Sequence, residues 1–287
     1  MLDQAIAAAA APFSGVFACR AENLTTGETA GFDADALLPA ASTIKVGVMA
    51  AVYAAIEAGE MDPEERIMVA AEHWRPGSGV LKELAPGLAP TVADLVRLMT
   101  VVSDNVATLI LVERLGVARI NAALRGWGLE QTTLVWDLDK GPRDYAVATP
   151  RELARLMALI ATDAIVSPNA CAAMRDHLAR QQYRDQIGRY LPFHPYWNDP
   201  HRPQPMALMN KTGFQAAVRA DAAIMSAAGT VFVLATMTEG SRDRGFAPEQ
   251  EGAVLNGRVA RLVFDTWVPG LPHDETWPSS DGPAVPS

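Results

Sequence analysis

Hydrophobic and polar positions recur with two different periods along this chain, and the periods predict where strands and helices lie. Residues 15–33 are typical of a strand pair with a turn at 23–27, and an Ala-rich helix is expected over 1–10. A long series of helices follows, predicted at 43–58, 91–101, 105–115, 117–127, 150–162 and 168–182. Strands return at 207–214, 221–228 and 230–238, before a last helix at 249–267.

Strands at both chain ends with helices between them predict a sheet built from the two termini and an inserted helical lobe. We expect residues 1–40 and 185–268 to form the sheet-containing lobe and residues 41–184 to form the helical lobe. Residues 269–287 are rich in Pro and Gly and are expected to be a flexible tail. A cleft between the lobes is the natural ligand site.

Composition narrows the possible classes of protein. The 287 residues are 49% hydrophobic and 20% charged, which is typical of a compact soluble protein and excludes disorder for most of the chain. The net charge of −9, from 33 acidic and 24 basic residues, repels phosphate backbones and anionic lipid. We therefore expect no nucleic-acid partner and no membrane association. The uncharged stretch 222–238 contains Gly229 and β-branched residues, so two strands fit better there than a membrane span.

The chain start and the metal-binding residue types give further expectations. Asp3 lies where a signal peptide needs Lys or Arg, so the chain as given is expected to be cytoplasmic, or periplasmic or secreted if a leader was removed. Cys19 and Cys171 stand in apolar surroundings and are interpreted as core thiols. The five His show no metal-ligand spacing. We expect no metal and no organic cofactor.

Candidate chemistry begins with Ser42 and Lys45. At positions i and i+3 of a helix the two side chains share one face, with Cβ atoms about 5–6 Å apart. A lysine among apolar neighbours gives up its proton more readily and becomes a base that can activate a serine hydroxyl. The structural alternative is that Ser42 caps a helix and Lys45 is an ordinary surface lysine.

Two further short motifs have structural alternatives of their own. Ser103-Asp104-Asn105 falls between two predicted helices, where all three residue types are common caps. Lys211-Thr212-Gly213 lies in an apolar strand, where an edge lysine and a glycine bulge are ordinary. All three motifs in this order are expected by chance in about one chain in a thousand. The combination therefore favours a catalytic site.

In this order the motifs resemble those of the penicillin-recognising serine hydrolases, most closely the class A β-lactamases. The resemblance covers about residues 1–268 and includes further matching text at 77–81, 98–99, 148–150 and 180–185. It implies an α+β fold with an antiparallel sheet formed by both chain ends, flanked by helices, and an inserted all-helical lobe. It also implies a small-molecule substrate that is a β-lactam, an ester or an amide, with or without a carboxylate.

The resemblance implies a role for each matched residue. Ser42 would be acylated, Lys45 would be the general base or proton shuttle, and Ser103 would relay the proton to the leaving atom. The remaining roles are a positive charge at Lys211, contact with the substrate amide by Asn105, binding of a carboxylate by Thr212 beside Gly213, and an oxyanion hole from the backbone N–H groups of Ser42 and Phe214. Arg219 would be either a carboxylate anchor or a solvent-facing arginine.

The sequence departs from the family pattern between Thr133 and Thr149. Class A β-lactamases carry a loop glutamate here that activates the deacylating water, whereas residues 134–148 contain no Glu. Asp137, after Trp136, is our candidate replacement, and Asp139 and Asp144 are alternatives. The structural alternative for all three is a solvated loop acid or a salt bridge with Arg143.

This departure leaves three functions open. The first is a β-lactamase-like serine hydrolase, and the second is an esterase, amidase or peptidase with little β-lactam turnover. The third is an acyl-trapping binding protein without turnover. A second departure is the proline-rich segment 191–205, whose Phe193, Tyr196 and Trp197 would form either an aromatic wall over the cleft or a surface loop.

Overall fold

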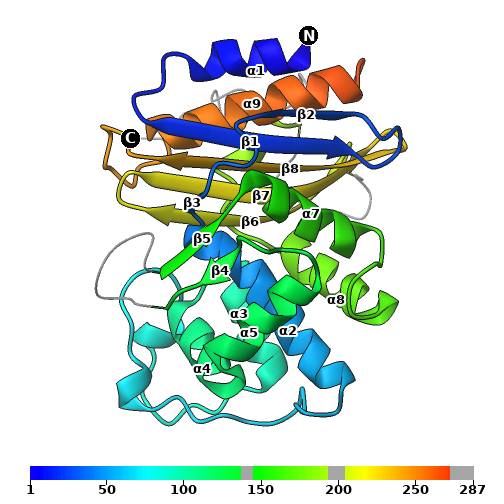
Figure 1. The fold of residues 1–287 in the computed structure, drawn as a ribbon. Helices are drawn as coiled ribbons and strands as arrows, with labels where there is room; N and C mark the ends of the chain where they lie inside the picture. Colours follow the sequence, from blue (N-terminus) through cyan, green and yellow to red (C-terminus); the bar gives the residue numbers. More distant parts are fainter. Residues whose placement is uncertain (137–144, 193–203, 272–287) are drawn as a thin grey trace, which may run out of the picture.

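Both ends of the chain contribute strands to one antiparallel sheet, as predicted (Figure 1). The computed structural model describes residues 1–136, 145–192 and 204–271. Within these residues the larger sheet has the strand order β2-β1-β8-β7-β6. Its strands are β1 (Val16–Asn23), β2 (Thr29–Phe32), β6 (Ala207–Gln215), β7 (Val218–Ala227) and β8 (Thr230–Glu239).

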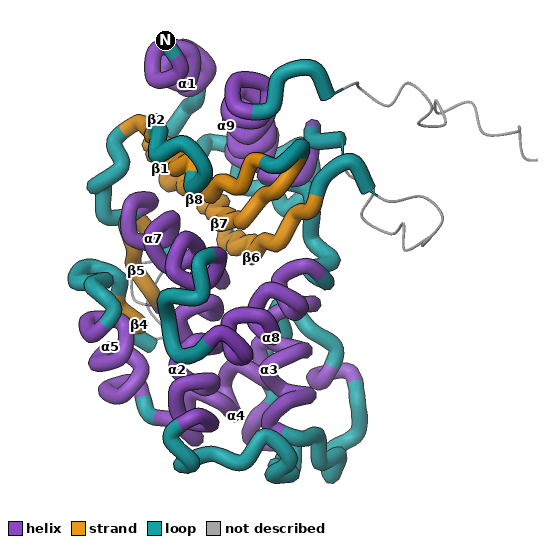
Figure 2. Tube along the Cα trace, turned by 90° about the vertical axis from the view of Figure 1, so that its right-hand side faces the viewer, coloured by secondary structure: helices purple, strands orange, loops and turns teal. Residues whose placement is uncertain are grey.

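One face of this sheet is covered by α1 (Leu2–Ala10) and α9 (Glu251–Trp267), which lie side by side in Figures 1 and 2. Their apolar side chains pack on the strands, and the rings of Phe232 and Trp267 meet edge to face at 5.5 Å. The other face meets the helical lobe. Because β7 and β8 are buried on both faces, the uncharged stretch 222–238 forms two central strands, as expected.

The helical lobe surrounds α2 (Lys45–Glu57), which is apolar nearly all round and is therefore buried. The helices packed in this lobe are α3 (Val92–Val101), α4 (Asn105–Leu115), α5 (Val117–Gly126), α7 (Pro150–Ala161) and α8 (Pro168–Ala179). Thr149 caps α7 by accepting a hydrogen bond from the Glu152 N–H at 3.2 Å, and Pro150 occupies the first turn, as the sequence predicts. Among the described residues, we find no helix with the length and apolar character needed to span a bilayer.

A second, small sheet joins the two lobes and was not predicted. It consists of β3 (Leu38–Pro39), β4 (Thr133–Leu134) and β5 (Ala146–Ala148), in the order β3-β5-β4. Strands of two or three residues carry too few alternating positions to stand out in a sequence. This sheet fixes the approach to the predicted nucleophile, since the Ala40 N–H donates to the Ala146 carbonyl at 3.0 Å.

The start of the first long helix differs from the prediction. A 3-10 turn, η1 (Ala41–Ile44), precedes α2, which begins at Lys45 rather than at residue 43. Ser42 therefore lies in a tight turn ahead of the α-helix and not within it. Cys19 and Cys171 are buried free thiols, which confirms their interpretation as core residues. Burial raises the pKa of Cys19 to about 12.

Candidate active site

Ser42 is held in a strained turn pressed against strand β6. The preceding residue, Ala41, has a φ of 45°, a left-handed conformation that costs a non-glycine residue about 1–3 kcal/mol. The Thr43 hydroxyl donates to the Ala40 carbonyl at 2.6 Å and tightens the turn. A Cβ at Gly213 would lie 2.7 Å from the Ser42 nitrogen and 3.0 Å from the Ala40 oxygen. Glycine at 213 thus allows β6 to pass directly beside the serine.

Lys45 connects the first motif to the second. Its side chain is buried, and its Nζ donates to the Ser103 carbonyl at 2.7 Å, the Ser103 Oγ at 3.1 Å and the Asn105 Oδ1 at 2.8 Å. The alternative of an ordinary surface lysine is therefore wrong. Ser103 itself has a φ of 54°, so this turn is also strained.

Lys211 connects the third motif to the same point. It is fully buried although β6 is an edge strand, and its Nζ donates to the Ser103 Oγ at 3.0 Å and to the Thr212 carbonyl at 2.7 Å. Lys211 does lie on an edge strand, as the structural alternative supposed, but its side chain is buried and points to Ser103. The Ser103 hydroxyl thus lies between the ammonium groups of Lys45 and Lys211, and all three motifs meet there.

Burial sets the electrostatics of the two lysines. Desolvation, aided by the positive charge of Lys211 and opposed by Asp104, holds the pKa of Lys45 well below its usual range. Desolvation, opposed by Asp221, lowers the pKa of Lys211 to about 7. Both side chains therefore lose a proton more readily than a solvated lysine does.

Asp104 caps a helix, which was the structural alternative for the Ser103-Asp104-Asn105 motif. Its Oδ1 accepts from the N–H groups of Val106 and Ala107 at the start of α4, at 2.9 and 3.0 Å. Its Oδ2 accepts from the N–H groups of Val80 and Leu81, at 2.7 and 2.9 Å. Asp104 therefore also anchors the loop at 77–81, a function that the sequence did not reveal.

Asn105 faces both the lysine and this loop. Its Oδ1 accepts from Lys45, its Nδ2 donates to the Pro76 carbonyl at 2.8 Å, and its backbone N–H donates to the Ser78 carbonyl at 3.0 Å. The loop approaches so closely that a Cβ at Gly79 would lie 2.4 Å from the Asp104 carboxylate. Gly79 has a φ of +109°, which glycine adopts without strain.

The predicted binding residues follow along β6 and β7. Thr212 is fully buried, and its Oγ1 has no hydrogen-bond partner within the described part of the chain. Phe214 pairs with Arg219 across the hairpin. Only 2% of Arg219 is exposed, so the solvent-facing alternative is wrong.

A buried polar network behind Lys211 was not anticipated. The Asp221 carboxylate accepts from the Asn210 Nδ2 at 3.0 and 3.2 Å and from the Ile187 N–H at 3.0 Å. The Arg184 Nη1 donates to the Asn210 Oδ1. Burial raises the pKa of Asp221 to about 7. The available signal was a lone acid inside the apolar segment 220–227, because an isolated charge in a buried strand requires a partner.

Several predicted residues lie outside the described part of the chain. They are Asp137, Asp139, Asp144, Phe193, Tyr196 and Trp197. Glu152, the first glutamate after the loop, has a structural role: its carboxylate accepts from the backbone N–H groups of Gln131 and Thr132 and from the Thr132 hydroxyl. Glu152 is therefore already engaged away from the three motifs.

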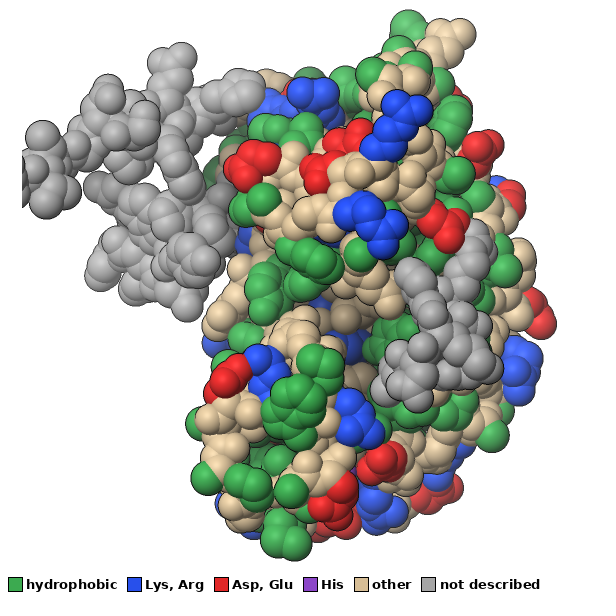
Figure 3. All heavy atoms as spheres, turned by 90° about the vertical axis from the view of Figure 1, so that its left-hand side faces the viewer, with side chains coloured by type: hydrophobic (Ala, Val, Ile, Leu, Met, Phe, Trp, Pro, Cys, Tyr) green, Lys and Arg blue, Asp and Glu red, His purple; other side chains and the backbone are tan. Residues whose placement is uncertain are grey.

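The surface view relates these contacts to the shape of the molecule. Figure 3 shows a hollow between the sheet side and the helical lobe, with Lys and Arg atoms visible at its floor. A concave site with buried titratable groups is the expected form of a small-molecule active site.

Comparison with known proteins agrees with this geometry. The model of the beta-lactamase enzyme family matches residues 1–267. The solved structure of a beta-lactamase from Sphaerobacter thermophilus superposes with a TM-score of 0.82 at 30% identity, covering 92% of this chain and 96% of that one. A single-residue mutant of PBP-A, solved as an acyl-enzyme complex with penicillin G, superposes with a TM-score of 0.81 at 26% identity, covering 92% and 95%.

A curated relative matches over a shorter length. The beta-lactamase regulatory protein BlaB of Streptomyces cacaoi is 32% identical over 143 residues. The match spans 48% of this chain and 46% of BlaB, just under half of each protein.

Proposed function

Because the chain belongs to the beta-lactamase enzyme family, we propose that it is a serine hydrolase whose Ser42 is acylated by a small carbonyl substrate. The observation that carries the proposal is the position of the Ser103 hydroxyl between Lys45 and Lys211, at 3.1 and 3.0 Å. Two buried lysines around one hydroxyl cost desolvation free energy. We infer that this cost is retained because the Ser103 hydroxyl transfers a proton during catalysis.

Acylation uses Lys45 as the base. The Ser42 oxygen attacks the substrate carbonyl carbon, and its proton passes to the neutral Nζ of Lys45. Burial favours that neutral form by lowering the pKa of Lys45. The carbonyl electron pair moves onto oxygen, and the backbone N–H groups of Ser42 and Phe214 stabilise the resulting charge.

Ser103 completes acylation by protonating the leaving atom, while the oxyanion re-forms the carbonyl and the bond between the carbonyl carbon and the leaving atom breaks. A serine hydroxyl has one proton and two acceptor lone pairs. When Lys45 and Lys211 both donate to the Ser103 oxygen, both lone pairs are used and the hydroxyl proton is free to point at the leaving nitrogen or oxygen. That proton is replaced from Lys45, which received one from Ser42, so the proton balance of the step is closed.

Deacylation requires a group that activates water. The absence of Glu from 134–148 leaves Lys45 and Asp137 as the groups proposed to activate water, with a slow second step expected. Penicillin G is a reasonable first probe, because a PBP-A mutant was solved as its acyl-enzyme. Esters and amides are the alternative substrates, and an acyl-trapping protein is the alternative function.

Mass spectrometry of the intact protein tests the proposal. The protein is incubated with penicillin G and, separately, with p-nitrophenyl acetate, and the mass increment and its lifetime are followed in wild type and in Ser42→Ala. We expect an increment with at least one probe that maps to Ser42 and is lost in the variant. A transient increment identifies a hydrolase and a persistent one an acyl trap. An unlabelled Ser42 with both probes, or equal labelling of Ser42→Ala, contradicts the proposal.

A further inference from the structure

A cavity of about 380 Å³ lies where the ends of β6 and β7 meet the segment that follows α8. Its lining includes Tyr183, Asp185, Phe214, Arg219, Phe246 and Pro248. A protein cavity of about 150 Å³ is sufficient to bind benzene. This cavity therefore has room for an aromatic ring with substituents.

Three aromatic side chains form one wall of the cavity. The ring of Phe214 meets Tyr183 at 5.7 Å and an interplanar angle of 83°, and meets Phe246 at 6.3 Å and 74°. Phe246 is 63% exposed, although a ring of this size is usually buried. In an edge-to-face pair the ring that presents its edge keeps its faces available, and an available ring face attracts a further aromatic group.

Arg219, which also lines the cavity, holds this wall in place. Its Nη1 donates to the carbonyls of Gln215 and Val218 at 3.0 and 2.8 Å, and its Nη2 donates to that of Gly245 at 2.6 Å. The guanidinium carbon lies 5.6 Å from the centre of the Phe246 ring. Because its donors are largely used by main-chain carbonyls, Arg219 orients Phe246, and the binding of a carboxylate is left to Lys211 and Thr212.

The cavity lies on the leaving-group side of Ser42. Phe214 directly follows Gly213, which packs against the Ser42 nitrogen. At the other end, the Gln182 N–H donates to the Val101 carbonyl at 3.0 Å, which places Tyr183 and its neighbours beside the turn that carries Ser103. Ser103 is the residue that protonates the leaving atom in the proposed mechanism.

We propose that this cavity is a specificity subsite for an uncharged aromatic leaving group, so that aryl-bearing esters and amides are the favoured substrate class. The inference rests on the proposed function, since it requires acylation of Ser42. Phe246 acts here as a specificity residue. It contacts the leaving group and takes no part in proton transfer.

Two acetate esters that deliver the same acetyl group test the inference. The rate of Ser42 acetylation is measured by intact-protein mass spectrometry with phenyl acetate and with trifluoroethyl acetate, in wild type and in Phe246→Ala. Each variant-to-wild-type ratio cancels the intrinsic reactivity of the ester. We expect Phe246→Ala to lower the rate with phenyl acetate about threefold to tenfold, the effect of losing an aromatic contact, and to leave trifluoroethyl acetate unchanged.

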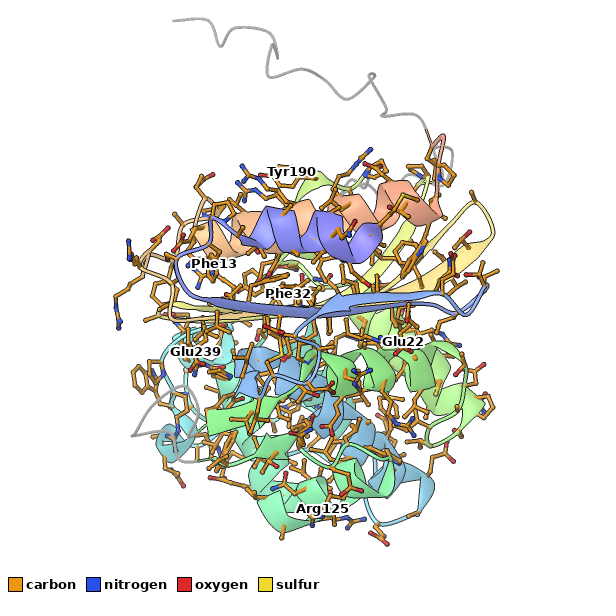
Figure 4. The ribbon with its side chains drawn as sticks, turned by 45° about the horizontal axis from the view of Figure 1, so that its top comes forward. Phe13, Glu22, Phe32, Arg125, Tyr190 and Glu239 are labelled. Atoms are coloured by element: carbon orange, nitrogen blue, oxygen red, sulfur yellow. The ribbon has the colours of Figure 1, made fainter. Side chains whose placement is uncertain are left out.

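Two further variants make the comparison specific. Phe246→Tyr keeps the ring and is expected to keep the wild-type preference. Tyr190→Ala removes another exposed aromatic, which Figure 4 places by the α1 and α9 layer, on the side of the sheet away from the helical lobe. It is expected to leave both rates unchanged.

The outcomes separate this inference from the proposed function. Failure of both esters and of penicillin G to label Ser42 contradicts the proposed function itself. Labelling by penicillin G or by trifluoroethyl acetate, without labelling by phenyl acetate, overturns the subsite alone. If both esters label Ser42 and Phe246→Ala lowers the two rates equally, or changes neither rate, the subsite is overturned. The hydrolase proposal is then unaffected. Equal loss in Tyr190→Ala also overturns it, because the effect then does not come from the cavity.

Discussion

Replacing Gly213 by Ala is expected to slow the acylation of Ser42 while the protein still folds. The new Cβ would lie 2.7 Å from the Ser42 nitrogen, 3.0 Å from the Ala40 oxygen and 3.0 Å from the Ala41 Cβ. Ordinary van der Waals contacts begin near 3.4 Å, so the closest contact is about 0.7 Å too short. None of these atoms is the end of a flexible side chain, so relief requires the β6 backbone or the Ala41–Ile44 turn to move.

The size of that movement gives the expected magnitude. Misplacing a reacting group by about 1 Å costs on the order of a hundredfold in rate, so a shift of several tenths of an ångström predicts a loss of about tenfold to a hundredfold. Overpacking of this kind also destabilises a protein by about 1–3 kcal/mol. For a chain of this length, that lowers the melting temperature by several degrees.

Acylation kinetics and thermal unfolding measured on the same samples check this prediction. Gly126→Ala is the matched control, because a Cβ there meets nothing within 4 Å, and it should acylate at the wild-type rate. A Gly213→Ala protein with wild-type kinetics and melting temperature would refute the idea that β6 positions the serine. An equal slowing in Gly126→Ala would show that the effect is not local.

Three further predictions follow from buried charges. Lys45→Met should slow acylation about a hundredfold to ten-thousandfold, because the base is lost. In the wild type, the acylation rate should increase as the pH rises, and this increase should occur well below pH 10.5 because burial lowers the pKa of Lys45. Pre-steady-state labelling across pH tests both expectations. Asp104→Ala removes the acceptor of four backbone N–H groups and should lower the free energy of unfolding in urea by about 3 kcal/mol, and a loss below about 1 kcal/mol would contradict it. Burial lowers the pKa of His177 to about 4, so between pH 6.5 and pH 4 the unfolded chain gains a proton at this residue that the folded protein does not. The free energy of unfolding of the wild type should therefore fall by up to about 3 kcal/mol over this range. His177→Gln should lack this part of the pH dependence in urea titrations, and identical pH dependences would refute it.

The motifs and most element positions were predictable because they depend on local spacing. Ser42 and Lys45 are three residues apart, and Pro150 directly after Thr149 is a local signal that favours a helix start. The strands predicted at 221–228 and 230–238 come mainly from the uncharged stretch 222–238, and in the structure they span 218–227 and 230–239, so the first begins earlier and includes Arg219. The two- and three-residue strands of the small sheet were missed, because they are formed by pairing between distant segments and carry no periodic pattern of their own.

The sequence by itself determined which residues are candidates for chemistry, and only the tertiary structure decided which of them meet. Lys45 and Lys211 reach the Ser103 hydroxyl across separations of 58 and 108 residues, and no periodicity carries that information. The same holds for Arg219, whose burial depends on the segment near Gly245 folding over it. Because desolvation lowers the pKa of a lysine, it was the packing of the sheet against the helices that lowered the pKa of both side chains.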